Sequence, residues 1–570
     1  MGDAPQRGPG SGPAEHRGRR IRARHYAILV SVLAVGAALT VSTVSLASSN
    51  RAQAANSVAA PATVAASEYL TPHTATPIKH VVVLFDENVS FDHYFGTYPN
   101  AANADGSPFH AKKGTPKVDG LTPQLLNHNP NSFNPVRLTH SQALTCDQNH
   151  GYTAEQQAFD GGKMDKFVQF TNTDTCTGQP ILFGQPGLVM DYYDGNTVTA
   201  EWNYAQNYAM SDNNYDTNFG PSTPGALNVI SGSDGDAYAV SPTTGAVVPD
   251  PGTVSTLNSK GLGTIYGDLD PAFDGCSDGS HTSTNPLGVA TGQNIGDLLN
   301  ARHITWGWFQ GGFAPTSTNA AGFPVCGATH NNIGGNAVAD YSPHHNPFEY
   351  YKSTANPKHL PPSSEAAIGR TDQANHQYDL SDFFTTLKDG NMPSVSYLKA
   401  AEYQDGHPGY SDPLDEQNFI VNTVNAIEQS KYWKSTAIVL TYDDSDGWYD
   451  HVDSPRVNGS NDPTTDQPVC TSTPVRLGDT PDRCGYGPRL PLIVISPYTR
   501  DNYVSHKVTD QSSVVSFIED NWLNGERIGH GSFDVLAGSL TGPHGLLDFQ
   551  VRPQFRPLIL NPTTGAVVSG

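Results

Sequence analysis

The chain has 570 residues, with 32 Lys and Arg against 55 Asp and Glu and a formal charge of −23. This length is enough for one large domain or two ordinary ones. The acidic balance disfavours nucleic acid as a partner, because affinity for nucleic acid comes largely from neutralising phosphates with basic side chains. An anionic substrate would need a locally positive site, which a metal ion and histidines can supply.

The first 54 residues are predicted to be an export signal. A cluster of arginines at 17–24 precedes an apolar run at 26–47, and Ala52-Gln53-Ala54 has the small-x-small pattern of a signal-peptidase site. Cleavage there leaves 25 Lys and Arg against 53 Asp and Glu, a formal charge of −28. The apolar run is also long enough to span a bilayer, so an uncleaved N-terminal anchor is the alternative. We expect a secreted protein, extracellular or in the cell envelope.

The rest of the chain is predicted to be one catalytic domain. We place a linker at 55–76, the domain at 77–560 and a short tail at 561–570. Between 232 and 300 the composition shifts to Gly, Ser, Thr, Asp and Asn, which indicates a loop-rich insertion of the kind that forms lids.

All six cysteines follow the export segment, and an even number in an oxidising compartment predicts three disulfides. Six cysteines allow fifteen pairings. We expect neighbours to pair, because each bond then closes one local loop: Cys146 with Cys176, Cys276 with Cys326, and Cys470 with Cys484.

Short apolar strands alternate with helices along the domain. The strand candidates are 78–85, 226–231, 304–309, 394–398, 437–442 and 490–496. The helix candidates are 154–170, 416–429 and 511–522, the last with Asp510 as its cap. Strands separated by helices predict an α/β fold with a mainly parallel central sheet flanked by helices.

Two of these strands run directly into acidic pairs. Glu87 and Asn88 follow the strand at 78–85, and Asp443 and Asp444 follow the strand at 437–442. Open α/β sheets bind ligands at the carboxyl ends of their strands, and adjacent carboxylates repel each other unless a cation lies between them. The four residues are therefore candidate ligands of one shared divalent cation. Mg, Ca or Mn suits oxygen ligands best, with Zn or Fe as alternatives.

Each acidic pair also has a structural interpretation. Asp443 and Asp444 could open a solvated turn with Asp446-Gly447, and Asn88 could cap a helix at 90–94.

Ser222 is the candidate nucleophile, in Gly220-Pro221-Ser222-Thr223-Pro224. A serine hydroxyl is a weak nucleophile until a base or a metal activates it. No Gly-x-Ser-x-Gly motif surrounds Ser222, which argues against an esterase triad. An ordinary proline-rich turn is the alternative.

Histidine is suited to binding a phosphate oxygen or protonating a leaving alkoxide. A histidine in a loop is more often simply solvated. The candidates for a catalytic role are His150, His344, His345 and His407.

Residues 78–98, Ile-Lys-His-Val-Val-Val-Leu-Phe-Asp-Glu-Asn-Val-Ser-Phe-Asp-His-Tyr-Phe-Gly-Thr-Tyr, resemble the opening signature of the bacterial phospholipase C and acid phosphatase phosphoesterases. These enzymes are related to the alkaline phosphatase superfamily. The resemblance covers 78–525. Further segments resemble the family in the same order: 162–167, 220–224, 344–348, 404–408, 441–451 and 510–522.

The resemblance implies a role for each candidate residue. The implied metal ligands are Glu87, Asn88, Asp443 and Asp444, joined by the hydroxyl of the nucleophile Ser222. The implied neighbours of the phosphate are His150, His345 and His407, with His344 beside them. Ser222 stands where the phospholipase C branch typically carries Thr, and Val89 where it usually carries Arg. Both departures favour a phosphomonoesterase of the acid phosphatase type.

We therefore expect a secreted, metal-dependent phosphoric-ester hydrolase that forms a phosphoserine and uses His345 or His407 to protonate the leaving group. Its substrate would be a small phosphate ester or a phospholipid, with membrane contact only through the N-terminal segment or a lipid substrate. Three alternatives stay open: a phosphodiesterase of the phospholipase C type, a catalytically inactive binding protein that keeps the fold, and a metal-independent serine esterase.

Overall fold

The computed structural model describes residues 73–570, apart from 178–180, 280 and 479. The predicted export segment at 1–54 and all but the last four residues of the predicted linker lie outside the described residues. Within the described part of the chain, no helix is both long enough and apolar enough to cross a bilayer. The alternative of an anchor at 26–47 falls outside the residues to which that finding applies.

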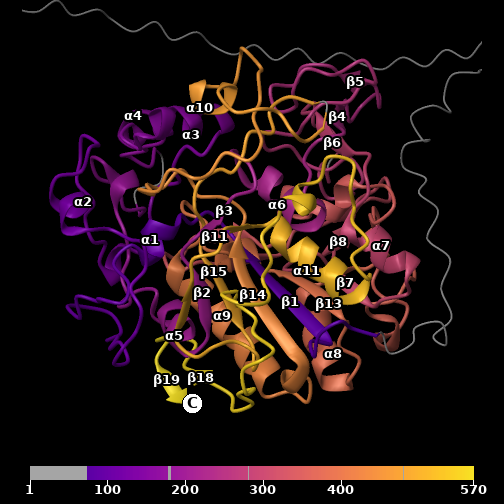
Figure 1. The fold of residues 1–570 in the computed structure, drawn as a ribbon. Coiled ribbons are helices and arrows are strands. Elements are labelled where there is room, and N and C mark those ends of the chain that lie inside the picture. Colours follow the sequence, from indigo (N-terminus) through magenta and orange to yellow (C-terminus); the bar gives the residue numbers. More distant parts are fainter. Residues whose placement is uncertain (1–72, 178–180, 280, 479) are drawn as a thin grey trace, which may run out of the picture. The chain divides into compact units, whose positions relative to one another are not determined.

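An eight-stranded sheet with the strand order β12-β7-β13-β1-β14-β15-β2-β16 organises the described residues (Figure 1). Its strands are β1 (His80–Asp86), β2 (Ala209–Ser211), β7 (Trp306–Gln310), β12 (Gln377–Asp379), β13 (Val395–Lys399), β14 (Thr436–Tyr442), β15 (Leu492–Ile495) and β16 (Tyr503–Ser505). The run from β12 to β14 pairs in parallel, as do β2 and β16. β15 runs antiparallel to both of its neighbours. The predicted α/β fold with a mainly parallel sheet is confirmed.

Helices and smaller sheets surround this sheet. The α-helices of the described residues are α1 (Phe91–Phe95), α2 (Pro123–Asn127), α3 (Tyr152–Phe159), α4 (Phe167–Phe170), α5 (Thr199–Asn207), α6 (Ser222–Ser231), α7 (Ile295–Ala301), α8 (Leu380–Asp389), α9 (Pro413–Glu428), α10 (Pro468–Thr471) and α11 (Ser512–Trp522). The other strands are β3 (Asn214–Tyr215), β4 (Ala237–Val240), β5 (Val247–Val248), β6 (Leu287–Ala290), β8 (Ser317–Thr318), β9 (Pro324–Val325), β10 (Thr329–Asn331), β11 (Ala337–Ala339), β17 (Thr509–Asp510), β18 (Ile559–Leu560) and β19 (Val567–Ser569).

Alternate side chains of the central strand enter two separate cores. On β1, Val82 and Leu84 join one core, while Val81, Val83 and Phe85 join the other. All five side chains are fully buried. Helices α5, α8 and α9 line the first core, and α6, α7 and α11 line the second. Because both faces are covered, the strand is a continuous apolar run instead of an alternating one.

One predicted strand, at 226–231, is wrong, because these residues form the second half of α6. Ala226, Leu227, Val229 and Ile230 are buried, and a short apolar run does not distinguish a buried strand from a buried helix. The helix ends at Gly232, whose φ of 60° is a left-handed conformation that glycine adopts without strain. The other five predicted strands are present as β1, β7, β13, β14 and β15.

The predicted helix at 154–170 is broken into α3 and α4. α3 ends at Phe159, and the next three residues, Asp160, Gly161 and Gly162, all have positive φ. The two glycines permit this turn. The helices predicted at 416–429 and 511–522 are confirmed as α9 and α11. The predicted cap at Asp510 is wrong, because the cap residue of α11 is Gln511, but the Asp510 carboxylate accepts a hydrogen bond from the amide of Ser512 at 3.1 Å.

The segment at 232–300, predicted to be a loop-rich insertion, carries the small antiparallel sheet β5-β4-β6 and most of α7. It is attached to the start of α6, because Asp268 accepts hydrogen bonds from the backbone amide and the hydroxyl of Thr223, both at 3.0 Å. The predicted tail at 561–570 contains β19, which pairs with β18.

The predicted pairing of the cysteines is confirmed. The disulfides join Cys146 to Cys176, Cys276 to Cys326 and Cys470 to Cys484, with Cα–Cα distances of 5.2, 5.8 and 5.6 Å.

A buried ionic cluster ties α1 to the loops beside the central strands. Arg489 donates to Asp92 and to Asp450, both at 3.1 Å, and its guanidinium lies 4.3 Å from the ring centre of Phe91. His451 Nδ1 lies 2.6 Å from Asp92. Asp92, Asp450 and His451 are close enough to hold a metal ion, but Arg489 already supplies positive charge to both carboxylates. We therefore interpret the cluster as a structural ion-pair network.

The cluster predicts a fall in stability at alkaline pH. Burial acts to lower the pKa of His451, but the charge of Asp92 and its hydrogen bond outweigh burial and raise the pKa to about 9. Since the folded pKa lies above the unfolded value of about 6.5, the stabilisation is complete below about pH 6.5 and is lost as the pH rises through about 9. The loss is at most about 3 kcal/mol. Melting temperatures of the wild type should therefore fall more steeply over this range than those of His451→Gln. Parallel curves would contradict this role of His451.

Candidate active site

The pairing of β1 with β14 brings the two predicted acidic pairs together. The strands pair in parallel from His80 opposite Thr436 to Asp86 opposite Tyr442. The residues that follow both strands therefore meet at the edge of the sheet that the carboxyl ends of its parallel strands form. The Asn88 amide donates a hydrogen bond to Asp443 Oδ1 at 2.9 Å. Asn88 caps no helix, since the cap of α1 is Ser90.

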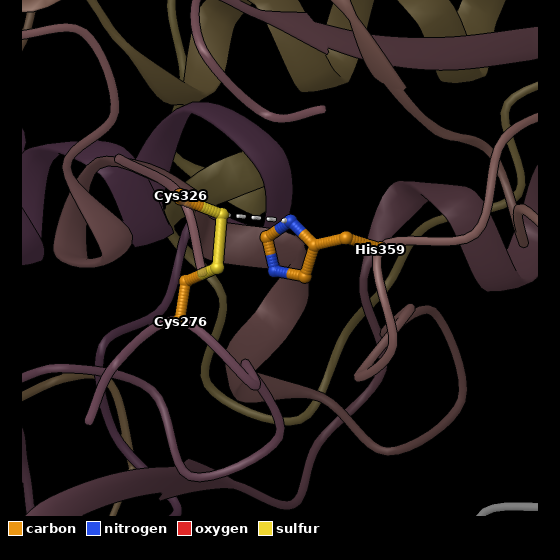
Figure 2. Close-up of side chains that lie close together, drawn as sticks. All are labelled: Cys276, Cys326 and His359. Atoms are coloured by element: carbon orange, nitrogen blue, oxygen red, sulfur yellow. Dashed lines mark hydrogen bonds between the residues drawn. A yellow bond between two sulfur atoms is a disulfide. The ribbon is translucent and has the colours of Figure 1, made fainter. Parts of the chain in front are cut away.

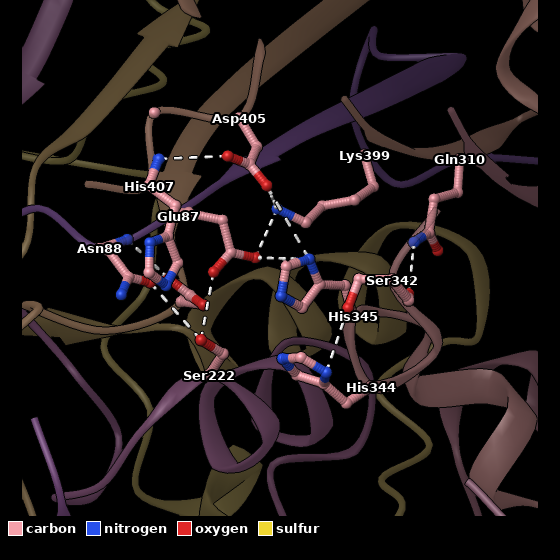
Figure 3. Close-up of polar contacts among 12 residues, drawn as sticks. Glu87, Asn88, Ser222, Gln310, Ser342, His344, His345, Lys399, Asp405 and His407 are labelled. Carbon is pink, nitrogen blue, oxygen red and sulfur yellow. Dashed lines mark hydrogen bonds and ion pairs between the residues drawn. The ribbon is translucent and has the colours of Figure 1, made fainter. Parts of the chain in front are cut away.

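Ser222 is the first residue of α6 and lies against this edge (Figure 3). Its Oγ is 3.1 Å from Glu87 Oε2, 3.2 Å from Asp444 Oδ2 and 3.5 Å from Asn88 Oδ1. A hydroxyl has a single hydrogen and cannot donate to three oxygens at once. The position at the N-terminus of a ten-residue helix also favours an anion, because backbone amides and the helix dipole point there.

The residues at this edge fit a divalent cation. Asp443 Oδ2 is buried without a hydrogen-bond partner. Burial and the charge of Asp443 raise the pKa of Glu87 well above its usual range, and the same two causes raise the pKa of Asp444. A cation among these oxygens would offset the repulsion and keep the carboxylates ionised. Carboxylate, amide and hydroxyl oxygens are the hard ligands that Mg and Ca prefer.

Gly225 allows α6 to lie close to the backbone of Asp443. A Cβ atom placed on Gly225 would lie 2.0 Å from the backbone oxygen of Asp443 and 2.7 Å from its carbonyl carbon. Any side chain at this position would therefore push the helix, and Ser222 with it, away from the acidic pairs.

The four predicted histidines occupy different surroundings. His345, in a 3₁₀ turn at Pro343–His345, has Nδ1 3.3 Å from Glu87 Oε1. His344 stacks edge-on against it at 4.3 Å and contacts Ser342 and Asp270. Burial and the neighbouring charges of His344 and Lys399 lower the pKa of His345 well below its usual range. His345 thus contacts Glu87, and His344 contacts His345.

His150 and His407 lie together on the Asn88 side, with ring centres 6.1 Å apart. His150 Nδ1 is 3.1 Å from Asp446 Oδ1, the same oxygen that accepts a hydrogen bond from the Asn88 side chain at 3.2 Å. Burial acts to lower the pKa of His150, but the charges of Asp444 and Asp446 outweigh it and raise the pKa well above the usual range. Burial lowers the pKa of His407.

Two charged residues at the site were not predicted. Lys399, the last residue of β13, forms a buried ion pair with Glu87 Oε1 and lies 3.7 Å from Asp405 Oδ2 (Figure 3). Burial acts to lower the pKa of Lys399, but Glu87 and Asp405 outweigh it and raise the pKa. Burial raises the pKa of Asp405 to about 7. Glu87, His345 and Asp405 also form a group that is compact enough to hold a metal ion.

The sequence carried a signal for Lys399. The strand predicted at 394–398 ends directly before it, and the rule that ligands lie at the carboxyl ends of parallel strands applies to that strand as well. Asp405 lies in the segment at 404–408, which resembles the family and contains His407.

Comparisons with known proteins identify relatives over most of the chain. The model of the Phosphoesterase family matches residues 78–523. The non-hemolytic phospholipases C of Burkholderia pseudomallei and Pseudomonas aeruginosa are 24% and 23% identical over 78% of this chain, which spans 55% and 54% of their length. Phospholipase C B of Mycobacterium tuberculosis is 22% identical over 78% of this chain and 74% of its own. A solved protein of the alkaline phosphatase superfamily from Vibrio parahaemolyticus matches 59% of this chain and 63% of its own, with 13% identity and a TM-score of 0.26. The chain thus spans about half the length of the first two relatives.

Replacing Gly225 should separate the serine from the acidic edge. In Gly225→Ala the new methyl group collides with the backbone of Asp443. A displacement of about 1 Å is enough to lower turnover about 100-fold. Gly292→Ala is the matched control, because a Cβ there meets nothing within 4 Å. We expect both variants to fold by circular dichroism and only the first to lose the hydrolytic activity proposed for this site. Equal turnover in the two variants would contradict this placement of α6.

Replacing Lys399 should make folding more dependent on a divalent cation. Lys399→Met leaves Glu87 and Asp405 buried without their counter-charge, which costs about 3–5 kcal/mol. A bound cation would supply the missing positive charge. Adding Mg²⁺ or Ca²⁺ after chelation should therefore raise the melting temperature of Lys399→Met more than that of the wild type. An equal or smaller rise would argue against a cation beside Glu87.

Proposed function

Because the chain belongs to the Phosphoesterase family, we propose that it is a metal-dependent hydrolase of phosphoric esters in which the Ser222 hydroxyl attacks phosphorus. One observation carries this proposal. A buried serine at a helix N-terminus has its Oγ within 3.5 Å of oxygens from Glu87, Asn88 and Asp444, which come from two separate strand ends. A serine with a purely structural role needs one hydrogen-bond acceptor, not two carboxylates and an amide oxygen.

In this proposal a metal is held by Glu87, Asn88, Asp443, Asp444 and the hydroxyl of Ser222. When bound, it would lower the pKa of that hydroxyl and offset the negative charge of the phosphoryl group. Ser222 forms a bond from Oγ to phosphorus while the ester bond to the leaving oxygen breaks, which gives a phosphoserine. Water then cleaves the phosphoserine and restores the hydroxyl.

The leaving oxygen needs a proton. His407 suits this step, because its Nδ1 faces the backbone oxygen of Pro408 at 2.5 Å and is therefore the nitrogen that carries hydrogen in the neutral ring. Nε2 is left to take up the proton that the Ser222 hydroxyl loses and to pass it to the leaving oxygen. His345, whose Nδ1 faces Glu87 at 3.3 Å, is the second candidate for this role. His150 and His344 are proposed to lie around the phosphoryl group and its substituent.

Two substrate classes are supported by different observations. The relatives are named phospholipases C, which favours the phosphodiester of a phospholipid. Ser222 and Val89, in place of the usual Thr and Arg, favour phosphate monoesters. We take the phospholipid diester as the first candidate and the monoester as the second. Relative turnover of phosphatidylcholine and a small monoester separates them.

We also propose that the protein is exported from the cytoplasm. Three disulfides are typical of proteins that fold in an oxidising compartment. They support the expectation of a secreted or cell-envelope protein, in which contact with a membrane would come through a lipid substrate or the N-terminal segment.

The nucleophile is tested by paired substitutions. Ser222→Ala should lower kcat/KM at least about 1,000-fold, because alanine has no hydroxyl with which to attack phosphorus. Its metal content and melting temperature should stay near those of the wild type. Ser222→Thr keeps a hydroxyl and should retain partial activity, while Asp443→Asn should lose bound metal together with rate.

Two outcomes would overturn the mechanism: retained turnover in Ser222→Ala, or no phosphoserine after acid quenching during turnover. Chelation separates the remaining alternatives. A metal-independent serine esterase would keep its activity after dialysis against a chelator, and an inactive binding protein would hydrolyse neither substrate class before or after it.

A further inference from the structure

A buried histidine lies against the disulfide between Cys276 and Cys326 (Figure 2). His359 Nδ1 is 3.4 Å from Cys326 Sγ and 2.8 Å from the backbone oxygen of Phe313. A disulfide sulfur has no hydrogen and a carbonyl oxygen only accepts, so Nδ1 must be the donor. Its N–H is shared between the carbonyl and the sulfur.

The opposite nitrogen of the ring faces a carboxylate. His359 Nε2 lies 2.8 Å from Asp274 Oδ1, and the Tyr341 hydroxyl donates to Asp274 Oδ2 at 2.5 Å. Burial acts to raise the pKa of Asp274, but the charge of His359 and the hydrogen bonds from His359 and Tyr341 outweigh it and lower the pKa. With acceptors at both nitrogens, the ring is held so that Nδ1 presents its hydrogen to Cys326 while Nε2 faces the carboxylate.

This disulfide is the one of the three in which neither cysteine is buried. Cys276 and Cys326 are both partly exposed. In the other two disulfides at least one cysteine is buried: Cys146 is 1% exposed, and Cys470 and Cys484 are fully buried. We therefore expect a small thiol to reach the 276–326 bond in the folded protein more readily than the other two.

We propose that the disulfide between Cys276 and Cys326 is a site of thiol–disulfide exchange, at which a small thiol becomes attached to Cys276 and Cys326 leaves as a thiolate beside His359. The direction follows from the position of the imidazole. Exchange is faster when the departing sulfur is the better-stabilised thiolate, and the N–H of His359, 3.4 Å from Cys326 Sγ, is placed to donate a hydrogen bond to that thiolate.

The exchange balances with two equivalents of thiol. The thiolate of the first thiol attacks Cys276 Sγ, a new sulfur–sulfur bond forms, and the electron pair of the old bond goes to Cys326 Sγ. A second thiolate attacks the sulfur of the attached thiol and releases Cys276 as a thiolate. The two thiols leave as one oxidised disulfide, and the two cysteines are reduced. The reverse steps restore the bond.

Partial reduction of the native protein tests the proposal. The protein is incubated with reduced glutathione, quenched with iodoacetamide and digested for peptide mass spectrometry. We expect glutathione on Cys276 and the alkyl label on Cys326, at a rate at least about tenfold above labelling of the other four cysteines. Reduction of all three disulfides at one common rate, or glutathione on Cys326 in place of Cys276, would overturn the proposal.

The role of His359 is tested with variants in the same experiment. His359→Gln removes the imidazole that faces Cys326. Asp274→Asn keeps the shape of the residue that holds the imidazole but removes its carboxylate. Both should slow labelling of Cys326 about tenfold or more, with the 146–176 disulfide as the internal control. An unchanged rate in a folded His359→Gln protein would refute the role of the imidazole. If that variant does not fold, the order and position of labelling in the wild type still decide the proposal.

Discussion

Buried negative charge at one edge of the central sheet is the constraint on which the rest of the structure depends. Glu87, Asp443, Asp444 and Asp405 are almost fully shielded from water, and each charge removed from water costs several kcal/mol unless it is paired. Lys399 lies among them, and His150, whose pKa the charges of Asp444 and Asp446 raise against the effect of burial, lies beside them. Two positive groups cannot balance four carboxylates. The cluster of carboxylates is stable only if bound protons or a cation neutralise the remaining negative charge. This is the physical reason for proposing a metal.

The frame around this edge is built from strand pairing and close backbone contact. Glu87 and Asn88 directly follow β1, Asp443 and Asp444 directly follow β14, and Lys399 is the last residue of β13. Gly225 lets the backbone of α6 rest on that of Asp443. Asp405 and the histidines lie on longer connecting segments. The paired strands therefore fix the oxygens of the proposed metal site, whereas the histidines of the site lie on segments that can vary without disturbing the sheet.

The sequence predicted this end of the sheet well, because the strands at 78–85 and 437–442 contain the apolar runs 81–85 and 437–440 and are followed directly by acidic residues. It failed at 226–231, where a run of buried apolar side chains fits a helix and a strand equally well. The neighbouring cysteines paired as expected, since each bond closes a local loop. The approach of α6 to Asp443 could not be predicted, because it depends on which backbone atoms face a single glycine in three dimensions. The contact of His359 with Cys326 joins residues that no local pattern connects.

The position of β1 in the sheet also constrains the order in which the protein can be built. β1 is the first strand along the described chain, yet it lies between β13 and β14, which belong to the last third. Both of its edges stay unpaired until the ribosome has passed Lys399, and the edge that pairs with β14 stays unpaired until it has passed Tyr442. An apolar strand with two open edges is a template for aggregation, and closing so long a loop is slow. Nascent chains of this protein should therefore depend on holding chaperones throughout most of translation, and truncation anywhere before the end of β14 should yield aggregates instead of a smaller folded domain.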